Sequence, residues 1–241
     1  YFSQFLKFSR LSKLRDLFGQ GAVPFLEIGY FITLLTFVQI TLIAFILIVF
    51  PLFFTKKKGR GKAYTLLHFS GIGIGFMFVE IIFIQQFILY FGNPVISASA
   101  VLSGMLISSG IGSLVSSRLK NSNRSILVVL SLVILFILFY AFILTPLLRA
   151  SINLPFFLKI LFSIVLISPV AFFMGMPFPI GLKYLDGKNN SLIPWAWGVN
   201  GCFSVISTVL ATIIAVEVGF LWVMLLASVA YGLALVANVF R

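Results

Sequence analysis

Residues 70–86 read Ser70-Gly-Ile-Gly-Ile-Gly-Phe-Met-Phe-Val-Glu80-Ile-Ile-Phe-Ile-Gln85-Gln86, an apolar run with glycines in its first half and an acid in its middle. Small residues such as these glycines let two helices approach closely inside a membrane. A charged side chain at membrane depth costs roughly 2.5–3.5 kcal/mol, so an acid there usually faces protein or water. The stretch therefore predicts a central transmembrane helix that other helices shield from lipid.

The composition is that of an integral membrane protein. Of the 241 residues, 61% are hydrophobic and only 9% are charged, whereas soluble domains carry about 25% charged residues. The net charge of +12 lies in short loops between apolar runs, which indicates anionic lipid headgroups and orientation signals rather than nucleic acid. The single cysteine, Cys202, excludes an internal disulfide and a cysteine-based metal site.

The apolar runs predict an all-α, polytopic transmembrane helix bundle of about seven spans, because one crossing takes about 20 residues. Residues 1–22 carry apolar and basic side chains at helical spacing, which predicts an amphipathic interfacial helix or a basic linker. Residues 23–241 are expected to form the bundle, and its fourth span, plain Leu, Ile, Val and Phe, is expected to face lipid. The expected spans are 25–54, 64–90, 95–115, 126–148, 155–171, a sixth that begins near Pro194 and is followed by a turn at Glu217 and Gly219, and 220–240.

Small residues predict where these helices pack against one another. The third span carries Gly104, Ser108 and Gly112 at steps of four residues, which places them close to one stripe of the helix. Such a stripe predicts a face that packs against another helix of the chain. Gly71 and Gly75, in the second span, are expected to serve the same purpose.

The segment Met174–Gly181 predicts a broken helix near the end of the fifth span. It contains two prolines one residue apart, Pro177 and Pro179, and proline removes a backbone donor and clashes with the preceding turn of a helix. Irregular backbone at membrane depth must be buried in protein or line a cavity.

Glu80 is the strongest functional candidate, as an intramembrane polar site. The best supply of partners for its carboxyl is the sixth span, where Asn200, Ser204 and Thr208 repeat every four residues. Three interpretations stay open: a proton carrier, a cation ligand, or a structural acid that is hydrogen-bonded to Asn200 and Ser204.

The sequence carries no catalytic motif, and we expect no cofactor and no metal site. Gly71-x-Gly-x-Gly75 lies inside a span and lacks the preceding strand and the later acid of a dinucleotide-binding loop. His68 is the only histidine, which argues against a histidine metal site and against haem ligation by paired histidines. No Ser-His-Asp set, phosphate loop or pair of acids is visible.

The basic residues fall mainly in alternate loops. They are dense after the first, third and fifth expected spans, in residues 56–62, 118–124 and 183–188, and Arg241 lies on the same side. The positive-inside rule therefore predicts that these loops and the C-terminus are cytoplasmic.

Five stretches, taken together and in order, resemble the C-terminal membrane region of bacterial fused membrane-bound proteins of the spermidine synthase-like family. In that family, membrane helices and a soluble aminopropyltransferase-like domain precede a membrane region like this one. The resemblance implies a multi-pass protein of the bacterial inner membrane, part of a longer chain, whose catalytic residues lie upstream and are absent here. It also implies that Tyr1 is cytoplasmic, which conflicts with the charge count unless residues 25–54 form a hairpin. The stretches are Tyr1-Phe-x-x-Phe-Leu-Lys-Phe, Pro24-Phe-Leu-Glu-Ile-Gly-Tyr30, Gly73-Ile-Gly-Phe-Met-Phe-Val-Glu80, Gly175-Met-Pro-Phe-Pro-Ile-Gly181 and Pro194-Trp-Ala-Trp-Gly-Val-Asn-Gly201.

Three functions are consistent with the sequence. The first is an anchoring and scaffolding module of a spermidine synthase-like protein, or a helical subunit of a larger membrane complex. The second is half of a transporter, with Glu80 and the break at Pro177 and Pro179 lining a path. The third is a membrane enzyme acting on a lipid or a quinone. A polar cavity that reaches Glu80 favours transport, and dry packing around Glu80 favours scaffolding.

Overall fold

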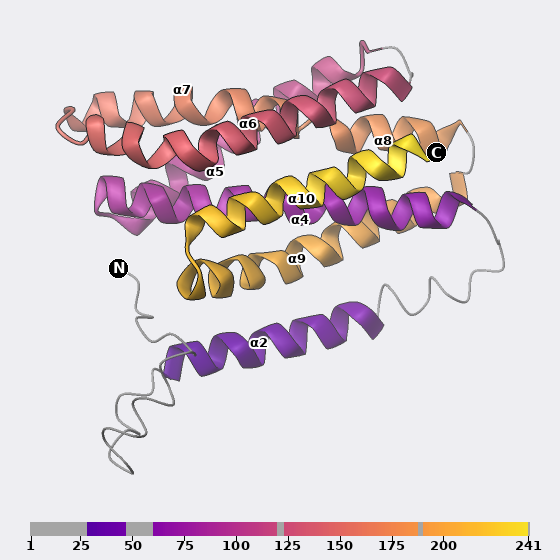
Figure 1. Ribbon diagram of the computed structural model, residues 1–241, viewed down its shortest axis with the longest axis horizontal. Helices are drawn as coiled ribbons and strands as arrows, with labels where there is room; N and C mark the ends of the chain where they lie inside the picture. The colour runs from indigo at the N-terminus through magenta and orange to yellow at the C-terminus, as the bar shows by residue number, and fades with distance from the viewer. Residues whose placement is uncertain (1–27, 47–59, 120–122, 188–189, 241) are drawn as a thin grey trace.

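The structure is a computed structural model that describes residues 28–46, 60–119, 123–187 and 190–240 (Figure 1). The regular secondary structure in these ranges is entirely helical, which confirms the all-α fold class. The amphipathic helix expected in residues 1–22 lies outside the described residues, as does the boundary to the bundle, and both stay predictions.

Six crossings in the described ranges are long and apolar enough to span a membrane. The chain is therefore a multi-pass membrane protein whose outer surface contacts lipid. One crossing consists of two helices in succession, α7 and α8, and a short 3₁₀ turn, η4 (Asn190–Leu192), leads from α8 into the next. The helices are α4 (Arg60–Phe91), α5 (Pro94–Ser116), α6 (Asn123–Ala150), α7 (Phe156–Met174), α8 (Pro177–Asp186), α9 (Ile193–Glu217) and α10 (Phe220–Val239).

One more described helix, α2 (Ile28–Ala44), falls in the first expected span. Its 17 residues measure about 26 Å at the rise of an α-helix, which is less than the roughly 30 Å of a hydrocarbon core. It packs on α9 at the edge of the bundle (Figure 1). Ile32, Leu35 and Leu42 are largely exposed and face away from the protein. Of the seven expected spans, six thus reach full length in the described residues.

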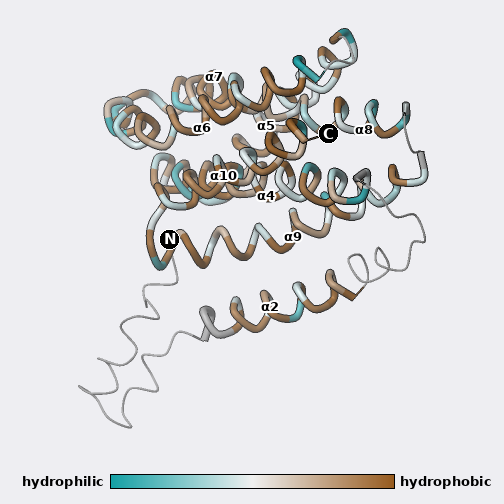
Figure 2. The backbone as a smooth tube through the Cα atoms, turned by 45° about the vertical axis from the view of Figure 1, so that its right-hand side comes forward, coloured by the Kyte–Doolittle hydropathy of each residue, from teal (hydrophilic) through white to brown (hydrophobic). Residues whose placement is uncertain are grey.

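Helix α4 lies at the centre of the bundle, as residues 70–86 predict. It packs against α10, α9 and α5. In Figure 1, α4 and α10 form a middle layer, with α5, α6 and α7 on one side and α9 on the other. Figure 2 shows hydrophobic residues along the length of these helices.

The connections between helices follow from their sequences. The Asn93 side chain caps α5, because its Oδ1 accepts from the backbone N–H of Val95 at 2.9 Å and of Ile96 at 3.2 Å. Proline follows in the first turn of α5, where no backbone donor is needed. Gly92 and Gly219 turn the chain between neighbouring crossings with φ of 71° and 103°, a region that favours glycine.

Glycines bring α4 and α10 to backbone contact. A Cβ atom on Gly71 would lie 2.5 Å from the carbonyl oxygen of Ala230, and one on Gly75 would lie 2.5 Å from the ring of Tyr231. Any larger residue at either position would push the two helices apart, so these glycines set the distance between them.

The small-residue stripe of α5 packs against α7. A Cβ on Gly112 would collide with the backbone carbonyl of Phe172. Ser108 Oγ donates to a serine hydroxyl of α7 at 3.1 Å. At Gly104 the fit is looser, because a Cβ there would lie 3.8 Å from Ile167.

The fourth expected span, α6, does not face lipid on all sides. Its buried residues, among them Ile126, Val133 and Ile137, lie on one face, and α6 packs against α10 and α7. Leu135 and Phe139 are exposed on the opposite face. The expectation was wrong for the buried face because lipid-facing and protein-facing side chains are equally apolar in a membrane helix.

The expected helix break is present, and it is shorter than Met174–Gly181. Helix α7 ends at Met174, Gly175 and Met176 are not helical, and α8 begins at Pro177. Both prolines therefore lie in the first turn of α8. That turn tolerates proline because its N–H groups have no partner within the helix. The prolines start the second helix, and the two residues before them make the break.

Candidate functional site

A pocket of about 400 Å³ lies where the helix break meets α4, α5 and α9. It therefore combines one irregular segment with three regular helices from distant parts of the chain. Its lining residues are Ile72, Gly73 and Phe76 from α4, Leu106, Ser109, Gly110 and Ser113 from α5, Met174, Gly175, Phe178 and Pro179 around the break, and Asn200 and Ser204 from α9.

Three glycines line this pocket, two of them at close backbone contacts and one at an open position. A Cβ on Gly73 would lie 2.8 Å from the carbonyl oxygen of Asn200, so α4 and α9 touch there at backbone distance. A Cβ on Gly175 would collide with the carbonyl group of Ser109, which brings the break against α5. At Gly110 a Cβ would have no neighbour within 4 Å, so the space in front of it is unfilled.

The pocket carries polar groups that the protein itself does not use. Ser109 Oγ donates to a backbone carbonyl of its own helix at 3.3 Å. The side chains of Ser113, Asn200 and Ser204 line the pocket and make no hydrogen bond to any residue that the structure describes. Two hydroxyls and an amide are thus available to a ligand, as donors and as acceptors.

Glu80 lies on the pocket side of α4 but outside the pocket lining. It follows Gly73 by seven residues, which is two turns and nearly the same face of the helix. It follows Phe76 by four residues, so it lies about 6 Å farther along the axis than that lining residue. Glu80 is partly exposed, and within the described ranges its carboxyl forms neither a hydrogen bond nor an ion pair.

The expected hydrogen bond between Glu80 and the polar face of α9 is not formed. Asn200 and Ser204 line the pocket next to Gly73 instead. Thr208, one turn farther on, donates its hydroxyl to the backbone carbonyl of Ser204 at 3.0 Å. Serine and threonine in membrane helices often bond to the preceding turn in this way, which removes them as partners for another helix.

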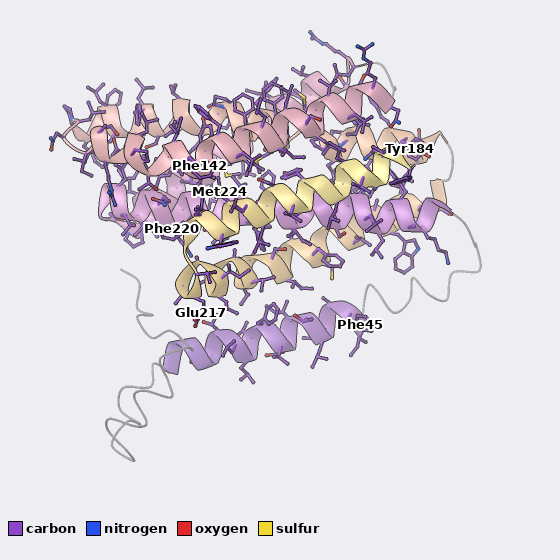
Figure 3. All side chains as sticks on the ribbon, in the orientation of Figure 1. Phe45, Phe142, Tyr184, Glu217, Phe220 and Met224 are labelled. Carbon is purple, nitrogen blue, oxygen red and sulfur yellow. The ribbon has the colours of Figure 1, made fainter. Side chains whose placement is uncertain are left out.

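His68 is fully buried at the junction of α4, α8 and α10. Its Nδ1 lies 2.9 Å from Nδ2 of Asn238, which can only donate, so Nδ1 accepts and the ring proton is on Nε2. Nε2 then donates to the carbonyl oxygen of Pro177 at 3.3 Å. The ring stacks on Tyr64 with centroids 5.2 Å apart, and Tyr64 meets the ring of Tyr184, labelled in Figure 3, at 4.8 Å.

Sequence reasoning missed the role of His68, which is to hold the first turn of α8. Its partners lie 109 and 170 residues away in the chain, so no local pattern marks them. The signal that was present in the sequence is a histidine within an apolar run, because a buried imidazole needs hydrogen-bonding partners.

The described residues contain no group of three or more His, Cys, Asp or Glu side chains that could hold a metal ion. Cys202 is buried. The chemistry that the site offers is therefore binding by neutral polar groups, with one carboxyl nearby.

Three of the five stretches that carry the family resemblance meet at this pocket, through Gly73, Gly175 and Asn200. The comparisons themselves add no relative: no family model, no curated protein and no solved structure matches the chain.

Proposed function

We propose that this chain binds a small polar or amphipathic molecule inside the membrane and passes it along a path between α4 and the broken α7–α8 crossing. The observation that carries the proposal is the pocket of about 400 Å³ at the helix break. Sites for small molecules are typically about 300–1,000 Å³ in volume. Discontinuous helices form the substrate sites of many transporters, because a break frees backbone and side-chain groups at membrane depth.

The lining defines the chemical class of the ligand. Ser113, Asn200 and Ser204 offer neutral donors and acceptors, which suit hydroxyl, amide or carbonyl groups. Phe76 and Phe178 supply aromatic surface in the same pocket. A molecule with one neutral polar end and one apolar end matches both parts of this lining.

Glu80 completes the proposal as the group that carries a proton or a cation along the path. A carboxyl in the middle of a membrane helix is costly unless it is neutralised or solvated. The described residues give Glu80 no partner, and a proton or a passing cation would lower that cost by neutralising its charge. Glu80 lies on α4 one turn beyond the pocket residue Phe76, so a ligand or an ion that leaves the pocket along α4 would reach it next.

Thiol labelling tests whether the pocket admits water. In a Cys202→Ala background the chain has no native thiol, because Cys202 is its single cysteine. Ser204→Cys places a thiol in the pocket, and we expect it to react with a small water-soluble methanethiosulfonate in proteoliposomes. Ser207→Cys is the matched control, because Ser207 lies on the same helix and is 1% exposed. Equal and slow reaction at both positions would show a dry pocket and overturn the proposal.

An infrared titration tests Glu80 directly. We expect a carboxyl band that changes with pH in the reconstituted wild-type protein and is missing in Glu80→Gln. The variant should fold normally, because glutamine keeps the shape of the side chain and removes only its ability to ionise. A Glu80→Gln spectrum identical to that of the wild type at every pH would exclude Glu80 as a proton carrier.

A second function is favoured by the close packing of the bundle. Gly71 and Gly75 hold α4 close to α10, and Gly112 holds α5 at backbone distance from α7, which suits a rigid anchor for another domain or for other membrane subunits. We propose this anchoring role as the alternative, within a spermidine synthase-like protein of the bacterial inner membrane. The intact mass of the native protein tests it, because a soluble aminopropyltransferase-like domain would have to precede Tyr1.

A further inference from the structure

A second pocket, of about 250 Å³, lies between α4 and α6 at the end of the bundle opposite to α8. It is separate from the pocket at the helix break and shares no residue with it. Its lining residues are Gln86, Leu89, Tyr90, Thr145, Leu148, Arg149 and Ile152.

The pocket lies at the edge of the hydrocarbon core. If about 20 residues of core are centred on α4 and on α6, the core ends near Gln86 on one helix and near Thr145 on the other. Tyr90 and Arg149 lie one turn farther out, in the last turns of their helices. The inner part of the pocket thus lies at the depth where acyl chains begin, and its outer part lies among the headgroups.

The polar groups of this pocket are mostly donors. Gln86 Nε2 donates to Thr145 Oγ1 at 3.3 Å, which leaves the second amide hydrogen of Gln86 and the hydroxyl hydrogen of Thr145 for another acceptor. Arg149 forms no hydrogen bond or ion pair with the residues that the structure describes, so its guanidinium offers several more donors. Tyr90 contributes only its ring surface to the lining, since its hydroxyl already donates to the backbone carbonyl oxygen of Ser151 at 3.1 Å.

The charge of this pocket is positive. Lys159 Nζ lies 5.0 Å from the centroid of the Tyr90 ring, which brings a second cation to the same wall as Arg149. Neither cation is paired with an acid in the described part of the chain. Cations at headgroup depth that lack an acidic partner attract anionic lipid headgroups, and arginine binds phosphate with parallel hydrogen bonds.

The remaining lining is apolar and open to the side of the bundle. Leu89 is 58% exposed and Ile152 is 44% exposed, whereas Leu148 is buried behind them. A ligand that uses the donors of Gln86, Thr145 and Arg149 can therefore lay a hydrocarbon chain along Leu89 and Ile152. A free inorganic anion would leave this apolar side unused.

We propose that this pocket binds the phosphate of an anionic phospholipid, with the phosphate on Arg149 and its ester region against Gln86 and Thr145. The acyl chains then run along the exposed leucine and isoleucine into the bilayer. The proposal is independent of the pocket at the helix break, and either can fail without the other.

Native mass spectrometry of the purified protein tests this, with phosphatidylglycerol and phosphatidylcholine added in equal amounts. We expect the wild type to retain phosphatidylglycerol preferentially, and Arg149→Gln to bind it about tenfold more weakly, since a charge-assisted bidentate contact is lost. Arg118→Gln is the matched control, because Arg118 is an exposed cation outside the pocket at the other end of the bundle. Thr145→Val removes a donor without changing charge or shape and should weaken binding to a smaller extent.

Three results would overturn the proposal. They are the absence of a preference for phosphatidylglycerol in the wild type, an equal loss in Arg118→Gln and Arg149→Gln, and displacement of the lipid by millimolar inorganic phosphate. The last would assign the site to a free anion. Thermal unfolding of each variant in the same detergent shows whether the variant is folded, and Arg149 is exposed enough for its replacement to leave the bundle intact.

Discussion

At the scale of single residues, glycines differ in what they do, although the sequence presents them alike. Gly104 and Gly112 belong to the same stripe of α5 and lie eight residues apart, with Ser108 midway between them. A Cβ on Gly112 would strike the backbone carbonyl of Phe172, whereas a Cβ on Gly104 would sit 3.8 Å from Ile167, an ordinary contact. Backbone cannot move aside as a flexible side chain can, so only one of the two positions requires glycine.

We therefore expect Gly112→Ala to destabilise the bundle by roughly 1–3 kcal/mol, the usual cost of overpacking. Gly104→Ala should change stability little. Thermal unfolding in detergent measures both, with Gly232→Ala as a further control because a Cβ on Gly232 meets nothing within 4 Å. Similar melting temperatures for Gly112→Ala and Gly104→Ala would contradict the close α5–α7 contact.

At the scale of helices, His68 ties three elements together. It lies on α4, donates to the first residue of α8 and accepts from Asn238 on α10. A Cβ on Gly181 of α8 would lie 2.6 Å from His68 Nε2, so the second helix of the broken crossing packs directly on the ring. The imidazole thus holds the start of α8 in place. It does so from the side of α4 that is opposite to the pocket residue Gly73.

We expect His68→Phe to destabilise the protein by about 1–3 kcal/mol, because the phenyl ring fills the space but leaves the Pro177 carbonyl and the Asn238 amide without this partner. Asn238→Leu should have a smaller effect. In the double variant the two losses should not add, because the second substitution removes a bond that the first has already broken. Additive losses in a double-mutant cycle would show that His68 and Asn238 act independently.

The limits of the helices could be predicted from the sequence, and their contacts could not. Apolar runs and loop charges mark α4, α5, α6, α7, α9 and α10 to within about one turn, because membrane thickness fixes their length. Helix α8 (Pro177–Asp186) lies beyond the fifth expected span, 155–171. Which face of α6 meets α10 has no such signal, since both faces are apolar. The break was expected at Pro177 and Pro179 and occurs at Gly175 and Met176. Helix α7 cannot continue through the prolines, whereas the first turn of α8 accommodates them.

The pocket at the break could be predicted only in part. Its polar residues Asn200 and Ser204 were singled out, but as partners of Glu80 rather than as part of a cavity. The lining combines glycines that are far apart in the chain: Gly73 and Gly175 lie at close backbone contacts, and Gly110 has open space in front of it. Such a coincidence depends on tertiary packing, which no local pattern contains.

At the scale of the whole molecule, the basic residues are divided unequally between the two ends of the bundle. The start of α4, the end of α5, the end of α8 and the end of α10 lie at one end in Figure 1. Lys62, Arg118 and Lys183 belong to that end. Lys183 Nζ donates to the carbonyl oxygen of Ser117 at 2.8 Å. The partial negative charge at the C-terminus of α5 also favours a cation at this position. Arg149 and Lys159 lie at the other end.

This division predicts that the α8–α9 connection is cytoplasmic and that the α6–α7 connection is on the outer side. Single thiols can report it, because replacing Cys202 removes the chain's one native cysteine. We expect Asn153→Cys, in the α6–α7 turn, to react with a membrane-impermeant maleimide in intact cells. Gly187→Cys, after α8, should react only after the membrane is permeabilised.

Both positions suit the experiment, since each is exposed at the end of a helix and a Cβ on Gly187 would meet only ordinary contacts at 3.8 Å. Labelling at Gly187→Cys but not at Asn153→Cys in intact cells would reverse the orientation. The pocket lined by Arg149 would then face the cytoplasmic leaflet, whose anionic lipids attract cations at headgroup depth. The labelling pattern therefore decides which leaflet supplies the phosphate, whether or not the pocket at the helix break conducts a ligand.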